Sequence, residues 1–292
     1  MNKGTLFGGS AYFLWGIFPI YWKWLKTVQP MEILLHRIVW SLVFVTVVLM
    51  LVKRWSWLKL IRSRPSIILI FAGTGVILAL NWLTFIWAVN SGYIVEASLG
   101  YFINPLLNVL LGFLLLKERL RPWQVVAVGI AALGVAWLTV NYGAFPWIAL
   151  TLAVSFGFYG LLRKIAPLGS MEGLFLETLF LLVPALFGML ILQARGSAAF
   201  FHGEAMTTLL LIFSGAVTAV PLILFSSSAR QISLTALGLL QYIAPTLQFL
   251  IGVIIYHEPF STARLIGFCI IWGALAVYIL EGVSYSHRSA VR

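Results

Sequence analysis

Long apolar stretches separated by short polar segments dominate the pattern along the chain. An α-helix that crosses the hydrocarbon core of a bilayer needs about 20 mostly apolar residues. With prolines, glycines and charges taken as boundaries, ten stretches fit this length. They are 4–25, 31–52, 65–89, 94–116, 122–140, 146–162, 171–194, 206–228, 234–256 and 264–282. The pattern therefore predicts an all-α membrane protein of ten transmembrane helices, with no soluble domain between them.

The composition excludes two other classes of protein. Of the 292 residues, 62% are hydrophobic and only 9% are charged, whereas a soluble domain carries about a quarter charged residues. So apolar a chain can neither bury its surface as a soluble globule nor remain disordered. The single cysteine, Cys269, allows no disulfide within the chain, so packing alone must hold the fold. Only residues 1–3 precede the first apolar stretch, and we expect no cleaved signal peptide.

The basic residues predict the orientation. If the N-terminus is cytoplasmic, 14 of the 19 Lys and Arg fall in cytoplasmic segments and 4 in outer segments, with Arg37 left inside a helix. Cytoplasmic loops of membrane proteins carry this excess, and an even number of helices then places both termini in the cytoplasm. The net charge of +11 is spread over loops. It is not gathered on one face, as nucleic-acid binding requires.

The chain also matches itself when it is shifted by 140 residues without a gap. The matches include Lys23/Arg163, Met31/Met171, Glu32/Glu172, Gly75/Gly215, Pro105/Pro245, Gly112/Gly252 and Glu118/Glu258. A repeat unit of five helices is odd, so the second copy must cross the membrane upside down. Inverted repeats build many secondary transporters, whose substrate site lies near the midplane. We expect a first repeat over 1–142, a second, inverted repeat over 143–282 and a cytoplasmic tail over 283–292.

Three stretches resemble a known family. They are Leu-His-Arg-Ile-Val-Trp-Ser at 35–41, Asn-Trp-Leu-Thr-Phe-Ile-Trp-Ala-Val-Asn at 81–90 and Glu-Ala-Ser-Leu-Gly-Tyr-Phe-Ile-Asn-Pro-Leu at 96–106. They are similar to the RarD-type, chloramphenicol-sensitive permeases in the EamA branch of the drug/metabolite transporter superfamily. The resemblance covers nearly the whole chain. It implies a fold of two five-helix inverted repeats and a transport role, without defining the substrate.

Four ionisable side chains stand out inside predicted helices, where a charge is costly and indicates function. Arg37 and Glu96 share one half of the membrane. We expect them to pair with each other, or Arg37 to bind an anionic group of a substrate. Glu177 matches Arg37 in the repeat, and either carries a proton in the transport cycle or faces a hydrated vestibule. His36 could titrate near neutral pH, although packing or hydrogen bonding is the commoner role.

Polar side chains also recur every three or four residues on one face of the fourth and ninth predicted helices. The first set is Tyr101, Asn104, Asn108 and Gly112, and the repeat supplies Gln241, Ala244, Gln248 and Gly252. Pro105 and Pro245 are expected to interrupt the hydrogen-bond ladder at the same depth in both helices. These faces predict a cavity for a polar group of a substrate, joined by Asn81, Trp82, Trp15 and Tyr159. The alternative is close helix packing in which the amides hold neighbouring helices together.

Motifs for other chemistry are missing from the sequence. Cys269 and the four histidines have no metal-ligand spacing, no GxxxxGK[ST] run binds nucleotide, and aspartate is absent. Glu118 and Glu258 are expected to make helix-end contacts, with a gating role as the alternative.

We therefore predict no catalysis and no cofactor. The chain is expected to be a transporter of the inner (plasma) membrane that exports or exchanges a small organic metabolite or drug by alternating access. Its partners would be that solute and the lipid bilayer, and the protein would be a monomer or homodimer. A receptor or scaffold that docks through the basic segment 53–64, and a passive channel, remain the alternatives.

Overall fold

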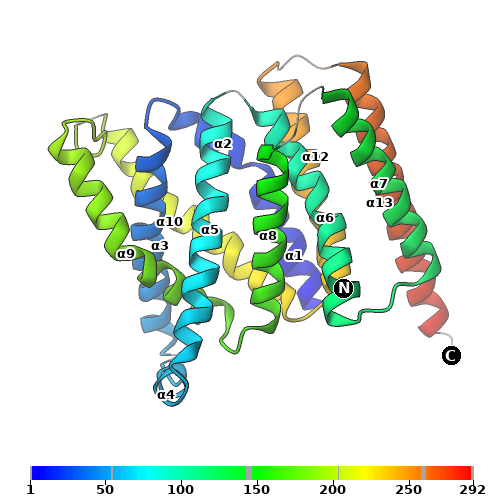
Figure 1. Ribbon diagram of the computed structural model, residues 1–292, viewed down its shortest axis with the longest axis horizontal. Helices are drawn as coiled ribbons and strands as arrows, with labels where there is room; N and C mark the ends of the chain where they lie inside the picture. Colours follow the sequence, from blue (N-terminus) through cyan, green and yellow to red (C-terminus); the bar gives the residue numbers. More distant parts are fainter. Residues whose placement is uncertain are drawn as a thin grey trace.

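In the described parts of the chain, which are residues 2–53, 55–91, 93–142, 147–202, 204–257 and 261–290, the computed structural model is helical and contains no β-strand. The helices stand side by side in an elongated body, with α9 at one end and the pair α7 and α13 at the other (Figure 1). Both chain termini lie toward the lower side in this view.

The helices occur in the following order. They are α1 (Lys3–Gly16), α2 (Phe18–Trp24), α3 (Pro30–Val52), α4 (Trp57–Ser63), α5 (Ser66–Asn90), α6 (Ile94–Leu116), α7 (Pro122–Tyr142), α8 (Trp147–Ile165), α9 (Ser170–Ala194), α10 (Ala205–Ala229), α11 (Leu234–Leu240), α12 (Ile243–Leu250), the π-helical turn η1 (Ile251–Ile255) and α13 (Thr262–Ala290).

Within the described residues, eight segments are long and apolar enough to cross a membrane, by length and composition. They are Pro30–Val52, Ser66–Asn90, Glu96–Leu116, Pro122–Asn141, Trp147–Ile165, Ser170–Ala194, Ala205–Ala229 and Ala236–Ile255. They coincide with eight of the ten expected stretches. The fold is therefore that of a multi-pass membrane protein, because helices satisfy their backbone groups internally where lipid offers no partners.

The first and last expected stretches differ from this group. The stretch 4–25 is divided at Ile17 into α1 and α2, and Pro19 stands in the first turn of α2, where a proline starts a helix but cannot continue the preceding one. The stretch 264–282 lies inside α13, whose apolar part is Leu265–Tyr278.

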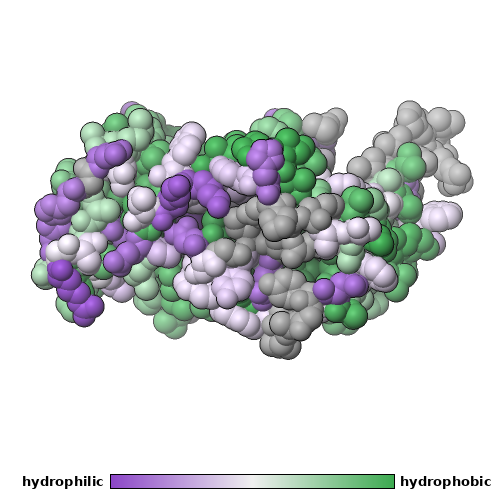
Figure 2. Space-filling model, turned by 90° about the horizontal axis from the view of Figure 1, so that it is seen from above, coloured by the Kyte–Doolittle hydropathy of each residue, from purple (hydrophilic) through white to green (hydrophobic). Residues whose placement is uncertain are grey.

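The sides of the helices are apolar, whereas one end of the body is polar. Large aliphatic residues such as Leu69, Val140 and Val183 are exposed on the helix sides. Seen from above, hydrophilic residues gather over part of the upper face, and hydrophobic residues show around its rim (Figure 2). This distribution suits a body whose sides contact lipid and whose ends contact water.

The starts of several helices repeat along the chain. Helices α9, α11 and α13 begin 140 residues after α3, α6 and α7, respectively. Their first residues are Ser170, Leu234 and Thr262. The packing repeats as well, because α3 packs on α10 as α9 packs on α5, and α6 packs on α8 as α12 packs on α1.

Equivalent glycines allow close crossing in two of these helix pairs, α5 with α9 and α10 with α3. A Cβ atom at Gly75 of α5 would lie 3.0 Å from the carbonyl oxygen of Glu177 on α9. A Cβ atom at Gly215 of α10 would lie 2.2 Å from the carbonyl carbon of Trp40 on α3. Small residues permit such backbone approach between membrane helices. The matched glycines of the sequence repeat therefore serve two matched helix crossings.

The expectation that Pro105 and Pro245 interrupt the hydrogen-bond ladders of their helices at the same depth holds only for Pro105, which has no N–H to donate inside α6. Helix α6 runs without a break through Pro105. The corresponding segment breaks between α11 and α12, at Gln241 and Tyr242, before it reaches Pro245. Pro245 then stands in the first turn of α12, where its missing N–H leaves no intrahelical hydrogen bond unmade.

Candidate functional site: a cavity and an ion-pair cluster

A cavity of about 40 Å³ lies between helices from both halves of the chain. Its polar wall consists of Tyr12, Arg37, Asn81, Tyr101, Gln241 and Gln248. Its aromatic wall consists of Trp15, Phe18, Trp82, Phe85 and Phe156, with Ala244 beside them. The mixture of aromatic walls with a few polar groups is typical of sites for small molecules.

Arg37 on α3 is the charged group of this cavity, and its side chain is 3% exposed. Its Nε donates a hydrogen bond to Thr218 Oγ1 on α10 at 3.0 Å. Its guanidinium carbon lies 4.6 Å from the ring centroid of Trp22 and 4.5 Å from that of Trp82, and cations are attracted to the faces of such rings. Within the described residues no carboxylate lies within 4.0 Å of Arg37. In the described part of the chain, the positive charge therefore lies against aromatic rings and the Thr218 hydroxyl and forms no ion pair with a carboxylate.

The expected ion pair between Arg37 and Glu96 is wrong. The Glu96 side chain is buried, and its Oε1 accepts a hydrogen bond from the backbone N–H of Ile148 at 3.2 Å. Ile148 lies in the first turn of α8, where free N–H groups and the helix dipole favour a carboxylate. Glu96 therefore serves the start of α8 and does not line the cavity.

Amide side chains join three helices and the α11–α12 junction around the cavity. Asn108 Nδ2 donates to Gln241 Oε1 at 3.0 Å and to Asn104 Oδ1 at 3.1 Å. Asn104 Nδ2 donates to the carbonyl of Ala153 on α8 at 2.6 Å. Asn81 Nδ2 donates to Ser155 Oγ on α8 at 2.9 Å. These bonds connect α5, α6, α8 and the α11–α12 junction.

The predicted cavity residues divide into two groups. Asn81, Trp82, Tyr101 and Gln241 line the cavity together with Arg37, whereas Asn104 and Asn108 are buried between helices and do not. The hydrogen bonds of these two residues join neighbouring helices, which is the arrangement that the alternative of amide-mediated packing describes.

Two cavity-wall groups have no hydrogen-bond partner within the described residues. They are the hydroxyl of Tyr12 and Nε2 of Gln241, both buried. A buried polar atom without a partner is costly. They are therefore available, with Arg37, to the polar groups of a bound molecule.

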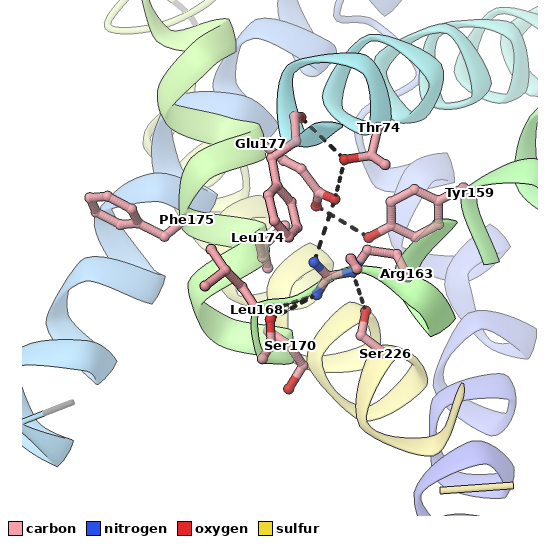
Figure 3. Close-up of polar contacts among 12 residues, drawn as sticks. Thr74, Tyr159, Arg163, Leu168, Ser170, Leu174, Phe175, Glu177 and Ser226 are labelled. Atoms are coloured by element: carbon pink, nitrogen blue, oxygen red, sulfur yellow. Dashed lines mark hydrogen bonds and ion pairs between the residues drawn. The ribbon is translucent and has the colours of Figure 1, made fainter. Parts of the chain in front are cut away.

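A second polar cluster is centred on Glu177 of α9 (Figure 3). It includes Arg163 in the last turn of α8, at the end of that helix that is lower in Figure 1. Glu177 Oε1 accepts a hydrogen bond from Thr74 Oγ1 on α5 at 2.8 Å, and Oε2 accepts one from the hydroxyl of Tyr159 on α8 at 3.3 Å. Arg163 Nη1 lies 3.7 Å from Oε1. The Glu177 side chain is fully buried. The expectation that Glu177 faces a hydrated vestibule is therefore wrong, because protein groups surround its carboxylate.

Arg163 is the polar residue that sequence reasoning missed. It was expected in a cytoplasmic loop, yet it lies in the last turn of α8 and is 2% exposed. Its Nε donates to Ser226 Oγ on α10 at 3.2 Å, and its Nη2 donates to the carbonyl of Ser170 at 2.7 Å. The available signal was its spacing of four residues from Tyr159, which places both side chains on one face of a helix.

His36 lies away from the cavity, on the side of α3 that faces the 195–202 segment. Its Nδ1 accepts a hydrogen bond from Trp40 Nε1 at 3.1 Å, and its ring centroid is 4.4 Å from that of Phe200. Among the expected neighbours of the cavity, Trp15 lines it, whereas Tyr159 belongs to the Glu177 cluster.

Glu118 makes the helix-end contact that the sequence predicted. Its Oε1 accepts a hydrogen bond from the N–H of Leu234 at 2.8 Å and lies 3.8 Å from Lys164 Nζ. Its repeat equivalent, Glu258, lies outside the described residues. Elsewhere in the described residues, no three His, Cys, Asp or Glu side chains are grouped as metal ligands.

Comparisons with known proteins agree with this architecture. Residues 2–140, nearly the expected first repeat, match the EamA-like transporter family. The chain is 43% identical over 292 residues to the "uncharacterized transporter YojE" of Bacillus subtilis (strain 168), covering 99% of this chain and 97% of the relative. It is 40% identical over 289 residues to protein RarD of Escherichia coli (strain K12), covering 99% and 98%. A crystal structure with 21% identity shares the fold, with a TM-score of 0.66 over 94% of this chain and 98% of the other.

The helical fold and these relatives define a multi-pass transporter of the inner membrane, a class of protein distinct from enzymes. The chain belongs to the EamA-like transporter family, as a RarD-type permease. The resemblance seen in the sequence motifs is therefore confirmed.

Proposed function

We propose that the chain is a secondary transporter that exports or exchanges a small organic solute by alternating access, and that the solute carries an anionic group bound by Arg37. The observation that carries this proposal is the buried guanidinium without a carboxylate partner on the cavity wall. An uncompensated charge at membrane depth is costly, and a substrate carboxylate or phosphate would compensate it. The aromatic wall would then hold the apolar part of the solute.

The repeated architecture supports the alternating-access part of the proposal. We infer ten spans, with α1 and α2 together as the first and α13 as the last, arranged as two inverted five-helix repeats. The 140-residue spacing of the helix starts and the matched crossings at Gly75 and Gly215 support this arrangement. The excess of basic residues in alternate loops supports cytoplasmic termini. Two copies of one fold can exchange conformations, which yields states open to either side.

The Glu177 cluster supports a cavity that is closed toward the lower ends of the helices. Thr74 precedes the cavity residue Asn81 by seven residues on α5, which is about 10 Å along a helix. Its bond to Glu177 joins the first half of the chain to the second, as does the contact between Glu118 and Lys164. In a transport cycle these bonds would break while the opposite end closes.

A receptor or scaffold and a passive channel remain the competing functions. A receptor would bind its partner through the basic segment 53–64. Removal of the basic charges of this segment would therefore impair function only if the protein is a receptor. A channel would show flux that does not saturate. Saturable uptake with counterflow in proteoliposomes therefore distinguishes a carrier from both.

The first experiment is a thermal-shift screen of the purified protein against anionic, zwitterionic and cationic metabolites and drugs. A ligand at 100 times its Kd adds about 2.7 kcal/mol to the free energy of unfolding, a readily measured shift. We expect anionic compounds to stabilise the wild type but not Arg37→Ala. The control is Arg195→Ala, which removes an exposed arginine and should be stabilised like the wild type. Stabilisation that survives in Arg37→Ala would remove Arg37 from the binding site.

A further inference from the structure

A groove of about 350 Å³ lies between α3, α9 and the 195–202 segment, separate from the central cavity. Its walls are mainly aliphatic and include Leu186, Met189 and Leu190 of α9. Leu186 is 44% exposed and Leu190 is 67% exposed. Both residues belong to an apolar segment long enough to span a membrane, of which only 33% is buried inside the protein. The medium that meets this groove is therefore lipid hydrocarbon.

Glu32 builds the upper wall of the groove. Its Oε1 accepts hydrogen bonds from the backbone N–H groups of Ala199 and Phe200, at 2.8 and 2.9 Å. These bonds hold the segment after α9 against α3 and bring the ring of Phe200 to 4.4 Å from that of His36. The groove is thus bounded by groups whose positions are held by hydrogen bonds.

His36 presents a hydrogen-bond donor in this groove. The indole Nε1 of Trp40 can only donate, so His36 Nδ1, which accepts from it at 3.1 Å, carries no proton. The ring is then neutral and carries its proton on Nε2. His36 lines the groove and is 1% exposed, and its Nε2 has no hydrogen-bond partner within the described residues.

The depth of His36 indicates which acceptor it meets. His36 follows Pro30, the first residue of α3, by six residues, which is about 9 Å along the helix axis. Leu190 precedes the end of α9 by four residues, or about 6 Å. The groove therefore lies in the upper part of the membrane layer, where the bilayer changes from hydrocarbon to polar groups. The ester carbonyls of phospholipids are the acceptors available at that boundary, and leaving the donor without one is costly in lipid.

We propose that this groove binds a phospholipid of the surrounding bilayer, with an acyl chain along Leu186, Met189 and Leu190 and an ester carbonyl accepting a hydrogen bond from His36 Nε2. The site is distinct from the cavity around Arg37 and does not depend on the proposed transport function. His36 and Arg37 are adjacent on α3, and His36 lines this groove whereas Arg37 lines the cavity.

The test compares two phosphatidylcholines that differ only in their linkage, dioleoyl diester and dioleyl diether, because the diether lacks the carbonyl. Each is offered at equal concentration to the delipidated wild type, and retained lipid is measured by native mass spectrometry. One hydrogen bond contributes about 1 kcal/mol net, so we expect the wild type to retain the diester about fivefold better. The preference should vanish in His36→Phe. Equal retention of both lipids by the wild type would overturn the proposal without any variant.

A second pair of variants tests the groove itself. Leu190→Trp fills the groove, whereas Val183→Trp places the same ring at a position of α9 that is 74% exposed and does not line it. We expect Leu190→Trp to lose the retained lipid and Val183→Trp to keep it, with circular dichroism showing equal helix content. If Leu190→Trp still retains the phospholipid, or if the wild type retains only detergent, then no phospholipid occupies this groove.

Discussion

Arg37 and Glu177 are 140 residues apart and occupy equivalent turns of α3 and α9, and each bonds to a threonine of the helix that crosses its own. Arg37 donates to Thr218 of α10 at 3.0 Å, and Glu177 accepts from Thr74 of α5 at 2.8 Å. The two charges have opposite signs and different surroundings. Glu177 has Arg163 beside it, whereas Arg37 lies against the rings of Trp22 and Trp82 with no carboxylate within 4.0 Å among the described residues. The repeat therefore places one charge in a satisfied cluster and its equivalent on the wall of a cavity.

The first prediction concerns the stability of the buried pair of Glu177 and Arg163. Removing one partner of a buried ion pair leaves an uncompensated charge and costs roughly 3–5 kcal/mol, whereas replacing both by apolar residues is often neutral. We expect Glu177→Leu and Arg163→Met each to lower the unfolding temperature in detergent. The double variant should recover most of the loss. If the two losses simply add, the side chains are not coupled.

The second prediction concerns opening of the lower end. Ser226 is 1% exposed and bonds to Arg163, so a cysteine at this position should react slowly with a hydrophilic maleimide. In a Cys269→Ser background, needed because Cys269 is exposed, we expect Glu177→Ala to speed labelling of Ser226→Cys about tenfold. A tenfold change corresponds to a shift of about 1.4 kcal/mol between closed and open states.

The matched control for this labelling experiment is Ser63→Cys, which lies on exposed α4. Its labelling rate should not respond to Glu177→Ala. Equal labelling of Ser226→Cys with and without Glu177 would mean that the cluster does not close this end.

The third prediction concerns the two glycine crossings. A Cβ atom at Gly75 or Gly215 would meet backbone atoms of the crossing helix, and overpacking costs about 1–3 kcal/mol. We expect Gly215→Ala to lower the unfolding temperature more than Gly75→Ala, because its nearest contact is shorter. Gly73→Ala is the control, since a Cβ atom at Gly73 on the same helix has nothing within 4 Å. Equal shifts for all three would show that the crossings tolerate a methyl group.

Much of the fold could be predicted from the sequence, because lipid forces the backbone into helices and hydropathy marks their length. Arg37, Asn81, Tyr101 and Gln241 could be assigned to one cavity because polar residues inside apolar helices face the protein interior. Their positions on that wall follow from the packing seen in the structure.

The partners of the charged residues could not be predicted in the same way. Hydropathy assigns a basic residue at the end of a helix to a loop, and Arg163 is buried only because α9 and α10 pack over the last turn of α8. Shared membrane depth suggested a pair of Arg37 and Glu96, but depth does not specify rotation about the helix axis. The same ambiguity explains Asn104, which shares a helix face with Tyr101 yet turns toward α8.

The last prediction separates amides that hold helices from amides that meet the solute. Asn108 and Gln241 share a hydrogen bond at 3.0 Å, but only Gln241 lines the cavity. Hydrogen bonds between membrane helices contribute about 0.6 kcal/mol on average. We expect a coupling energy of that order in a double-mutant cycle of Asn108→Ala and Gln241→Ala, measured by unfolding. Asn108→Leu should leave the Michaelis constant for transport unchanged, whereas Gln241→Leu should raise it, because Gln241 Nε2 is free to meet the solute. Equal Michaelis constants for both variants would place Gln241, like Asn108, among the residues that only hold the helices together.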